Sequence, residues 1–418
     1  MPEQYDIIIR NGRVIDPASN TDQVSDIGIK DSKIASVQSD LTGDAEQTMD
    51  AEEKVVCPGL IDIHTHLYSK VTTWGIDADP TCLAKGVTTA VDAGSASWVT
   101  FPGFRDLSID RSQGRVLCYI HISGLGLVYG PIGEMADIRY ACPEETAECV
   151  LENSDVALGI KVRQGGAQVE KNGIEPLKHA IKAAELSNTH VMTHLGGGVP
   201  IEDVLNLMRA GDIATHCYHC RSDTILGGDG KILEVVHQAR SRGVLFDVGH
   251  GGGSFGFETA RAAFEQHFLP DVISSDLHTL NHGGPVFDLL TTMSKFLALG
   301  MPIETVIEKT TLGPARAIHR EDSLGSLEVG READITILEE EEGEFELMDT
   351  KGDTVKCEKR LACAGVVRAG QLVDTAAWDD YEPRMPKAIE WQSLPGIRRT
   401  RPEIFEMVKE QLNLGVLE

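Results

Sequence analysis

The middle of the chain repeats one pattern, a short apolar run rich in β-branched residues that is followed in most cases by a stretch with helical periodicity. The eight apolar runs are residues 61–66, 87–92, 116–121, 157–163, 190–195, 213–216, 244–248 and 272–276. The clearest helical stretches are residues 176–186, 200–210, 231–242 and 257–267. Eight strands with helical crossovers over about 250 residues are typical of an α/β fold of the (β/α)8 TIM barrel type. An open doubly wound sheet is the alternative, but it usually carries a glycine-rich phosphate-binding turn after an early strand, and none follows the first two runs.

Both ends of the chain show a different sequence pattern, with short strand-like segments separated by turns. The segments are residues 5–10, 12–15, 24–30 and 33–37 near the N-terminus, and 333–338 and 361–373 near the C-terminus. Asn11-Gly12 and Asp31-Ser32 are predicted turns between the early segments. Two distant strand-rich ends predict one small β-sandwich domain that both ends build together, with the barrel inserted between them.

These patterns predict four segments. Residues 1–57 and 328–385 form the two parts of the small β domain, and residues 58–327 form the barrel. Residues 386–418 form a C-terminal extension, in which an amphipathic stretch at 403–412 is expected to pack on the body of the protein or on a neighbour.

Charge and composition narrow the class of partner. The 418 residues include 38 lysines and arginines against 65 aspartates and glutamates, which gives a formal net charge of −27. This excess repels polyphosphates and argues against nucleic-acid binding. No run of about 18 or more apolar residues is present, so no membrane-spanning segment is expected, and the first residues lack the features of a signal peptide. A small-molecule substrate is the expected partner, and the sequence leaves a homo-oligomer open.

The cysteines and one acidic block carry weaker information. Nine cysteines, an odd number without framework spacing, indicate reduced thiols and a cytoplasmic location. The acidic block Glu339–Glu346 is predicted to be a solvated loop or edge, and an acidic funnel for a ligand is the less favoured interpretation.

Two histidines end the first apolar run. His64 and His66 are separated by one residue, and side chains at such positions of a strand point to the same side. Two neutral imidazoles that face one point could supply two of the ligands of a divalent transition metal. Taken alone, the pair fits a set of satisfied core or surface histidines equally well.

Other polar residues follow the same rule, because they lie where a predicted strand ends, which is where barrel active sites lie. They are Lys161 and Arg163 on the fourth run, His194 on the fifth, His216 on the sixth and Asp276 on the eighth. In isolation, a lysine at a strand end is usually solvated and an aspartate after a strand is usually a helix cap. The set as a whole is more specific than any member.

Two histidines on strand one, lysine on strand four, histidines on strands five and six and aspartate on strand eight follow the ligand order of the amidohydrolase superfamily, which this chain resembles. The resemblance implies that Lys161 is N-carboxylated and bridges two divalent metal ions, with zinc as the expected metal. His64, His66 and Asp276 would hold the more buried ion, and His194 and His216 the second. The carbamate would also remove the cost of burying an ammonium group.

Further motifs are similar to a dihydroorotase-like branch that contains deacetylases of small acylated acids, over roughly residues 5 to 375. The motifs are Lys161-Val162-Arg163, Thr215-His216-Cys217, the run Asp247–Phe255, Ser275-Asp276-Leu277-His278 and Thr291–Lys295. His219 and Cys220 are not expected in that branch. They leave open which residue of this loop binds metal, and His216 is favoured.

The resemblance implies hydrolysis of an ester or amide bond by a metal-bridging hydroxide, with deacetylation of a small acylated hydroxy or amino acid as the favoured reaction. Asp276 would move the proton from the attacking water to the leaving group. Arg163 would stabilise the developing oxyanion or a substrate carboxylate, although a structural salt bridge is the alternative. His250 and His278 are further candidates for the substrate pocket.

Three other functions compete with this interpretation. A cyclic amidohydrolase of the dihydroorotase or hydantoinase type would use the same centre, because substrate contacts lie on loops. A one-metal nucleobase deaminase has no role for Lys161. A relative without metals would lack ligands, whereas all six positions are filled here. The sequence leaves the substrate, its stereochemistry and the preference for ester or amide open.

Overall fold

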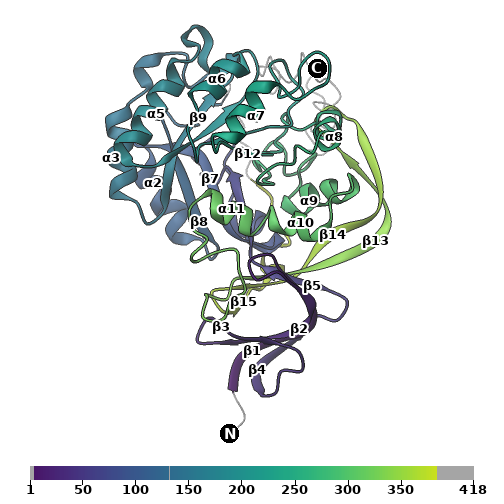
Figure 1. Ribbon diagram of the computed structural model, residues 1–418. Helices are drawn as coiled ribbons and strands as arrows, with labels where there is room; N and C mark the ends of the chain where they lie inside the picture. The colour runs from purple at the N-terminus through teal and green to yellow at the C-terminus, as the bar shows by residue number, and fades with distance from the viewer. Residues whose placement is uncertain (1–3, 131, 384–418) are drawn as a thin grey trace, which may run out of the picture.

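The chain forms a larger α/β part and a smaller sheet part, as Figure 1 shows. The structure is a computed structural model that describes residues 4–130 and 132–383. The C-terminal extension predicted for residues 386–418 lies outside the described residues. None of the helices in the described ranges combines the length and apolar character that a bilayer-crossing segment needs.

The larger part is built on a curled parallel sheet of seven strands. Its order is β12-β11-β10-β9-β8-β7-β6, so neighbours in the sheet are neighbours in the sequence. The strands are β6 (Leu60–Thr65), β7 (Val87–Ser97), β8 (Arg115–His121), β9 (Ala157–Gln164), β10 (His190–Leu195), β11 (Ile213–Thr215) and β12 (Leu245–Asp247). Every pairing between them is parallel. The first seven predicted strands are therefore confirmed.

The eighth predicted run, residues 272–276, is not a regular strand. Val272 forms an isolated parallel bridge with Asp247 of β12, and Leu277 forms one with Thr65 of β6. Between these bridges Asp276 has a φ of 50°, which an extended strand does not allow. The prediction of eight regular strands is therefore wrong in the last one, although its backbone lies between β12 and β6.

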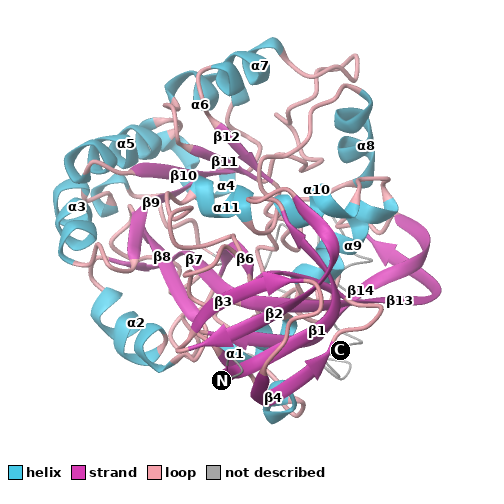
Figure 2. Cartoon of the chain, turned by 60° about the horizontal axis from the view of Figure 1, so that its bottom comes forward, coloured by secondary structure: helices cyan, strands magenta, loops and turns pink. Residues whose placement is uncertain are grey.

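Helices surround the parallel sheet and many of them cover its outer side (Figure 2), whereas Ala315 and Ala317 of the last one belong to the same buried cluster as Met192 on the inner side. They are α1 (Ala78–Thr81), α2 (Phe101–Leu107), α3 (Pro143–Glu152), α4 (Gly166–Val169), α5 (Glu175–Ser187), α6 (Ile201–Leu207), α7 (Glu234–Ser241), α8 (Phe257–Glu265), α9 (Leu289–Ala298), α10 (Ile303–Glu308) and α11 (Leu312–Ala317). All four predicted helical stretches contain a helix. The ends of α5 follow known rules, with Pro176 in the first turn and Asn188 ending the helix in the left-handed conformation.

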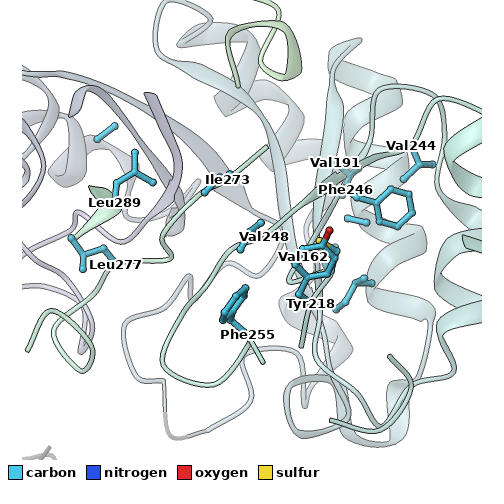
Figure 3. Close-up of a cluster of buried hydrophobic side chains, with 14 of the residues drawn as sticks. Val162, Val191, Tyr218, Val244, Phe246, Val248, Phe255, Ile273, Leu277 and Leu289 are labelled. Carbon is cyan, nitrogen blue, oxygen red and sulfur yellow. The ribbon is translucent and has the colours of Figure 1, made fainter. Parts of the chain in front are cut away.

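A large apolar cluster fills the space between the sheet and these helices. Figure 3 shows part of it, including Val162, Val191 and Phe246 from three strands of the sheet. Ile160 and Val162 of β9 both belong to this cluster. Because side chains alternate along a strand, Lys161 lies on the opposite, inner face of the sheet.

The smaller part is a sheet of eight strands from both chain ends, which confirms their predicted association. Its order is β15-β14-β13-β5-β1-β2-β3, with β4 paired to β1. The strands are β1 (Gln4–Asp16), β2 (Thr21–Lys30), β3 (Lys33–Gln38), β4 (Asp44–Asp50), β5 (Val55–Pro58), β13 (Ile335–Met348), β14 (Thr354–Arg368) and β15 (Gln371–Leu372). Hydrogen bonds connect all of them into one sheet, rather than the two sheets expected of a sandwich.

One of the two predicted turns in this part is wrong. Asn11 and Gly12 lie inside β1, at a register shift in its pairing with β2, and Asn11 has a φ of 61°. The pair is therefore a bulge, which can use the same left-handed backbone as a turn. Asp31 and Ser32 do form the turn between β2 and β3, both with positive φ.

The acidic block 339–346 lies in β13 and is not a loop. Residues 335–338 of β13 pair with both β5 and β14, whereas from Glu339 onward the strand pairs with β14 alone among the described strands. The block is therefore a solvated edge, which was one of the two predicted alternatives. Lys359 and Arg360 of β14 offset part of its charge by ion pairs with Glu340 and Glu341.

The β13–β14 ribbon connects the two parts of the molecule. Figure 1 shows it running from the small sheet along the side of the larger part towards α8 and α9. The Leu361 backbone N–H donates to Ser294 Oγ of α9 at 2.9 Å, and the Phe257 N–H of α8 donates to Asp349 Oδ2 at 2.9 Å. The smaller part is therefore tied to the helices that follow the last strands of the parallel sheet.

Candidate metal centre

Three of the predicted ligands lie together at the end of β6. One ligand atom each from His64, His66 and Asp276 lies within 4.8 Å of the others, and all three side chains are buried. Asp276 Oδ1 is 3.4 Å from His64 Nε2 and 3.1 Å from His66 Nε2. In the described part of the chain, no other group of three or more histidines, cysteines and carboxylates is so compact.

The other three predicted ligands surround the same point. Lys161 Nζ lies 3.2 Å from His64 Nε2. The ring of His216 lies 5.0 Å from that of His64 and 4.3 Å from that of His194, measured between centroids. Strands β6, β9, β10 and β11 and the segment after residue 272 thus bring the six predicted ligands into one buried cluster.

The loop after β11 places the ring of His216 against other predicted ligands, and its choice over His219 as the metal ligand stays a prediction. The ring of His216 faces this cluster, whereas His219 Nδ1 accepts the backbone N–H of Arg221 at 3.2 Å. Cys220 Sγ packs against the backbone of Gly256, so closely that a Cβ there would lie 2.8 Å from the sulfur.

Hydrogen bonds on the far side of two imidazoles determine their tautomers. His216 Nδ1 lies 2.6 Å from Gly249 O, and a carbonyl can only accept, so Nδ1 carries the proton. Thr215 Oγ1 donates to Asp247 Oδ2 at 2.6 Å, so it accepts from His64 Nδ1 at 2.9 Å. Both rings therefore present an unprotonated Nε2 to the cluster, which is the form that binds a metal.

The Nε2 atoms of His194 and His216 are buried and lack a hydrogen-bond partner among the described residues. Buried polar atoms are rarely left in this state without a reason, and an absent ion is one such reason. Together with the neutral imidazoles and the carboxylate, these atoms fit a site for zinc-like divalent ions.

Burial sets the protonation states of this cluster. It lowers the pKa of Lys161 to about 7, so that the neutral amine is populated near neutral pH. It also lowers the pKa of His64 to about 4 and holds those of His194 and His216 well below the ordinary value. A neutral amine is the form that reacts with carbon dioxide, and neutral imidazoles are the form that binds metals.

Asp276 remains ionised in this environment. Burial by itself would raise the pKa of its carboxyl, but nearby His64, His66 and His216 outweigh burial and hold the pKa well below its usual range. The cluster thus combines one carboxylate with nitrogen ligands.

The backbone around the cluster is tightly packed. Gly94 has a φ of 80°, and a Cβ there would lie 2.5 Å from Lys161 Cβ. Gly249 has a φ of 46°, and its Cβ would lie 2.3 Å from Thr215 Oγ1. His216 itself has a φ of 73°. A positive φ is strained for His216 but not for glycine, and strained residues persist where the surrounding structure holds them, often at functional sites.

The predicted substrate residues Arg163 and His278 lie beside the cluster, and Trp74 lies between them. The Arg163 guanidinium lies 4.7 Å from the centroid of the Trp74 ring, which stacks on His278 at 5.8 Å. Arg163 Nη1 also donates to Glu134 Oε2 at 3.3 Å. Arg163 therefore faces the site and makes the alternative salt bridge at the same time.

His250 has a different environment. Its Nδ1 lies 2.9 Å from Gly251 O and its Nε2 lies 2.9 Å from Lys295 Nζ, and the whole side chain is buried. Both polar atoms of the ring are thus engaged within the protein.

Sequence reasoning missed the residues that hold the ligands. Ser95 Oγ lies 2.9 Å from His66 Nδ1, and the Ser95 N–H donates to the buried Asp92 at 2.6 Å. Thr215 and Asp247 hold His64 in the same way. Asp92 and Asp247 are acidic residues in otherwise apolar runs, and that conflict with their surroundings was the available signal.

We expect Thr215→Val to weaken zinc binding by about 10- to 100-fold, because residues that orient metal ligands usually contribute that much. Valine keeps the shape but gives His64 Nδ1 no acceptor. Thr193→Val on the adjacent strand is the matched control, because Thr193 Oγ1 is buried without a hydrogen-bond partner among the described residues. Zinc affinity is measured by competition with a chelator. Equal affinities for the two variants would contradict the role of Thr215.

Known proteins of similar sequence identify the family of the chain. The model of the amidohydrolase family matches residues 55–373. A deacetylase from Agrobacterium fabrum is 35% identical over 393 residues, which cover 93% of this chain and 96% of that relative. A deacetylase from Enterococcus faecalis is 33% identical over 376 residues, which cover 88% of this chain and 99% of the relative.

Two solved structures are similar in fold and sequence. Those of an adenine deaminase and a dihydroorotase each have a TM-score of 0.82 and 32% identity to this chain. Each match covers 88% of this chain. It covers 100% of the adenine deaminase chain and 98% of the dihydroorotase chain. Since the family model and these relatives match most of its length, the chain belongs to the amidohydrolase family.

Proposed function

We propose that this protein is a metal-dependent deacetylase that removes an acyl group from a small acylated hydroxy or amino acid. Membership of the amidohydrolase family makes the chain a hydrolytic enzyme. The convergence of His64, His66 and Asp276 within 4.8 Å is the observation that carries the metal-dependent chemistry. The narrower reaction is supported by the deacetylases that are 33–35% identical over most of this chain.

The proposal includes two divalent metal ions, with zinc as the expected metal. His64, His66 and Asp276 would hold one ion, His194 and His216 the other, and a carboxylated Lys161 would bridge them. We also propose that the segment around Val272, although not a regular strand, closes a barrel between β12 and β6 within residues 58–327, and that residues 1–57 and 328–385 form the smaller domain. A cytoplasmic location stays a prediction.

When bound, the metals would lower the pKa of water from about 15.7 towards about 7 and polarise the scissile carbonyl. The protein's own residues would supply the remaining steps. Asp276 Oδ1 would accept a proton from the attacking water and return it to the leaving oxygen or nitrogen. Arg163 would bind the carboxylate of the substrate, with Trp74 and His278 beside it, and burial of the ligands would keep bulk water away from the charges that develop.

The reaction is tested with zinc-loaded protein and three groups of substrates: N-acetyl amino acids, acetylated 2-hydroxy acids and cyclic ureides. We expect kcat/KM to be highest for one of the two acetylated groups. The cyclic group matters because a solved dihydroorotase is 32% identical to this chain. Faster turnover of cyclic ureides than of every acetylated acid would favour the cyclic amidohydrolase instead. Adenine is included because a solved adenine deaminase is equally similar.

We expect Arg163→Met to raise KM for a carboxylate-bearing substrate by about 10- to 100-fold, the loss of one to two charged hydrogen bonds. The control is the neutral carboxamide analogue of the same substrate. Wild-type enzyme should strongly prefer the carboxylate, and the variant should lose that preference. If Arg163 only forms a structural salt bridge with Glu134, both substrates would be affected equally and the melting temperature would fall with activity.

A further inference from the structure

Lys295 of α9 is a buried lysine that the proposed mechanism does not use. Its side chain has no exposed surface, and its Nζ lies 2.9 Å from His250 Nε2 and donates to Pro285 O at 2.6 Å. Burial lowers the pKa of Lys295 to about 7. A lysine is rarely buried without a specific role, because its amine must find partners that replace water.

The tautomer of His250 follows from its contacts. Its Nδ1 donates to Gly251 O at 2.9 Å, because a carbonyl can only accept. Nε2 is then the acceptor for Lys295 Nζ. The ring also stacks on Phe255, at 4.6 Å between centroids and 21° between planes. His250 is therefore fixed at both nitrogens and on one face.

The turn that carries His250 touches two proposed metal ligands. Gly249 O accepts from His216 Nδ1 at 2.6 Å. On the other side of His250, Gly251 lies against Asp276, so closely that a Cβ at Gly251 would be 2.4 Å from Asp276 Oδ2. A shift of the 249–251 turn would therefore move the acceptor that orients His216 and the backbone that Asp276 packs against.

The β13–β14 ribbon holds the backbone around Phe255, whose ring stacks on His250. Thr350 Oγ1, in the loop between the two strands, donates to Phe255 O at 2.6 Å. The neighbouring Asp349 accepts the Phe257 N–H at 2.9 Å. Figure 3 shows Phe255 on the segment that follows Val248. Helix α9 and the ribbon thus hold the segment after β12 from two directions.

We propose that Lys295 and His250 are positioning residues, which hold the 249–251 turn so that His216 presents Nε2 to the metal centre. The link consists of three hydrogen bonds: Lys295 to His250, His250 to Gly251, and His216 to Gly249. This inference rests on the proposed function, because it concerns the ligands of the proposed second metal ion.

The first test is Lys295→Met, which keeps the length and apolar stem of the side chain but donates no hydrogen bond. We expect the weaker of the two zinc ions to bind about tenfold less tightly, since outer ligand partners contribute at least that much. Zinc affinity is measured by titration against a chromophoric chelator, and the melting temperature is measured in parallel. Unchanged affinity for both ions in a folded Lys295→Met variant would overturn the proposal.

Ser294→Ala is the matched control on the same helix. Ser294 is also fully buried, and its Oγ accepts the Leu361 N–H of the ribbon at 2.9 Å. This variant should lower the melting temperature while both zinc ions bind as in the wild type. Equal loss of zinc in Ser294→Ala and Lys295→Met would mean that general destabilisation of α9 is responsible, and the proposal would be wrong.

The double variant Lys295→Met/His250→Phe separates positioning from stability, even if the single variant does not fold. Replacing both partners of a buried hydrogen bond by apolar groups is often nearly neutral for stability. Pro285 O and Gly251 O still lose their donors, so we expect a double variant that is at least as stable as Lys295→Met and that binds one zinc ion weakly. Wild-type zinc affinity in the double variant would overturn the positioning role. A wild-type protein that binds no zinc would instead overturn the proposed function.

Discussion

Lys161→Ala is expected to bind less than one zinc ion per chain and to have no measurable hydrolytic activity. Lys161 Nζ lies 3.2 Å from His64 Nε2 in a buried cluster. A carbamate on this nitrogen would supply two oxygens that share one negative charge, in a site whose predicted ligands otherwise include one carboxylate. Without the carbamate, the site would have too little negative charge to balance two divalent metal ions.

A direct observation of the carbamate separates this explanation from simple misfolding. Wild-type protein prepared with 13C-bicarbonate should give one carbamate carbon signal, which Lys161→Ala lacks. A short carboxylate such as acetate carries the same pair of oxygens as the carbamate, so its addition should partly restore both zinc binding and activity. Full zinc content in Lys161→Ala, or wild-type protein with an unmodified Lys161 after zinc loading, would contradict the bridging role.

The positions of the site residues could be predicted because they follow from strand periodicity and from strand ends. His64, Lys161 and His194 each lie at or near the carboxyl end of a parallel strand, and such ends meet on one side of a curled sheet. A local sequence pattern is sufficient to assign these residues to strands. The common side of the sheet then brings them together without any knowledge of individual contacts.

The eighth strand could not be predicted in the same way, because side chains there compete with the regular ladder. The Ser275 backbone N–H donates to Oδ1 of the buried Asp62 at 3.1 Å, and the Ser274 and Ser275 hydroxyls donate to Asp247 and Asp62. These bonds join residues that are far apart in the sequence, and with them Asp276 adopts a positive φ. An apolar pattern reports burial, but it does not report which backbone groups remain available for pairing.

The same limit applies to the outer partners of the ligands and to the acidic block. Thr215 and Lys295 have ordinary sequence surroundings, and their roles depend on partners at distances of 32 and 45 residues, Asp247 and His250. The charges of the block around Glu340 are unusual for a strand, so the sequence leaves a loop and a solvated edge open as alternatives. In the structure, pairing with the basic segment around Lys359 allows a long ribbon there.

Asp276→Asn is expected to lower kcat by about 10²- to 10⁴-fold, which is the usual contribution of a general acid or base. Asparagine keeps the volume of the side chain and tolerates the positive φ of this position, so the backbone should not change. It loses the negative charge and the ability to accept a proton. The ionised state of Asp276, which the nearby His64 and His66 favour over the effect of burial, is therefore the property that the variant removes.

The measurement compares kcat at saturating zinc with the zinc content of the same sample, because Asp276 is also a proposed ligand. Asp271→Asn is the matched control: it makes the same chemical change five residues earlier, where the carboxylate accepts the Phe246 N–H and pairs with Arg240. That variant should keep its kcat. If Asp276→Asn retains two zinc ions and a kcat near that of the wild type, proton transfer must occur through another group. If it retains both ions and loses turnover, the carboxylate acts on the proton and not only as a ligand.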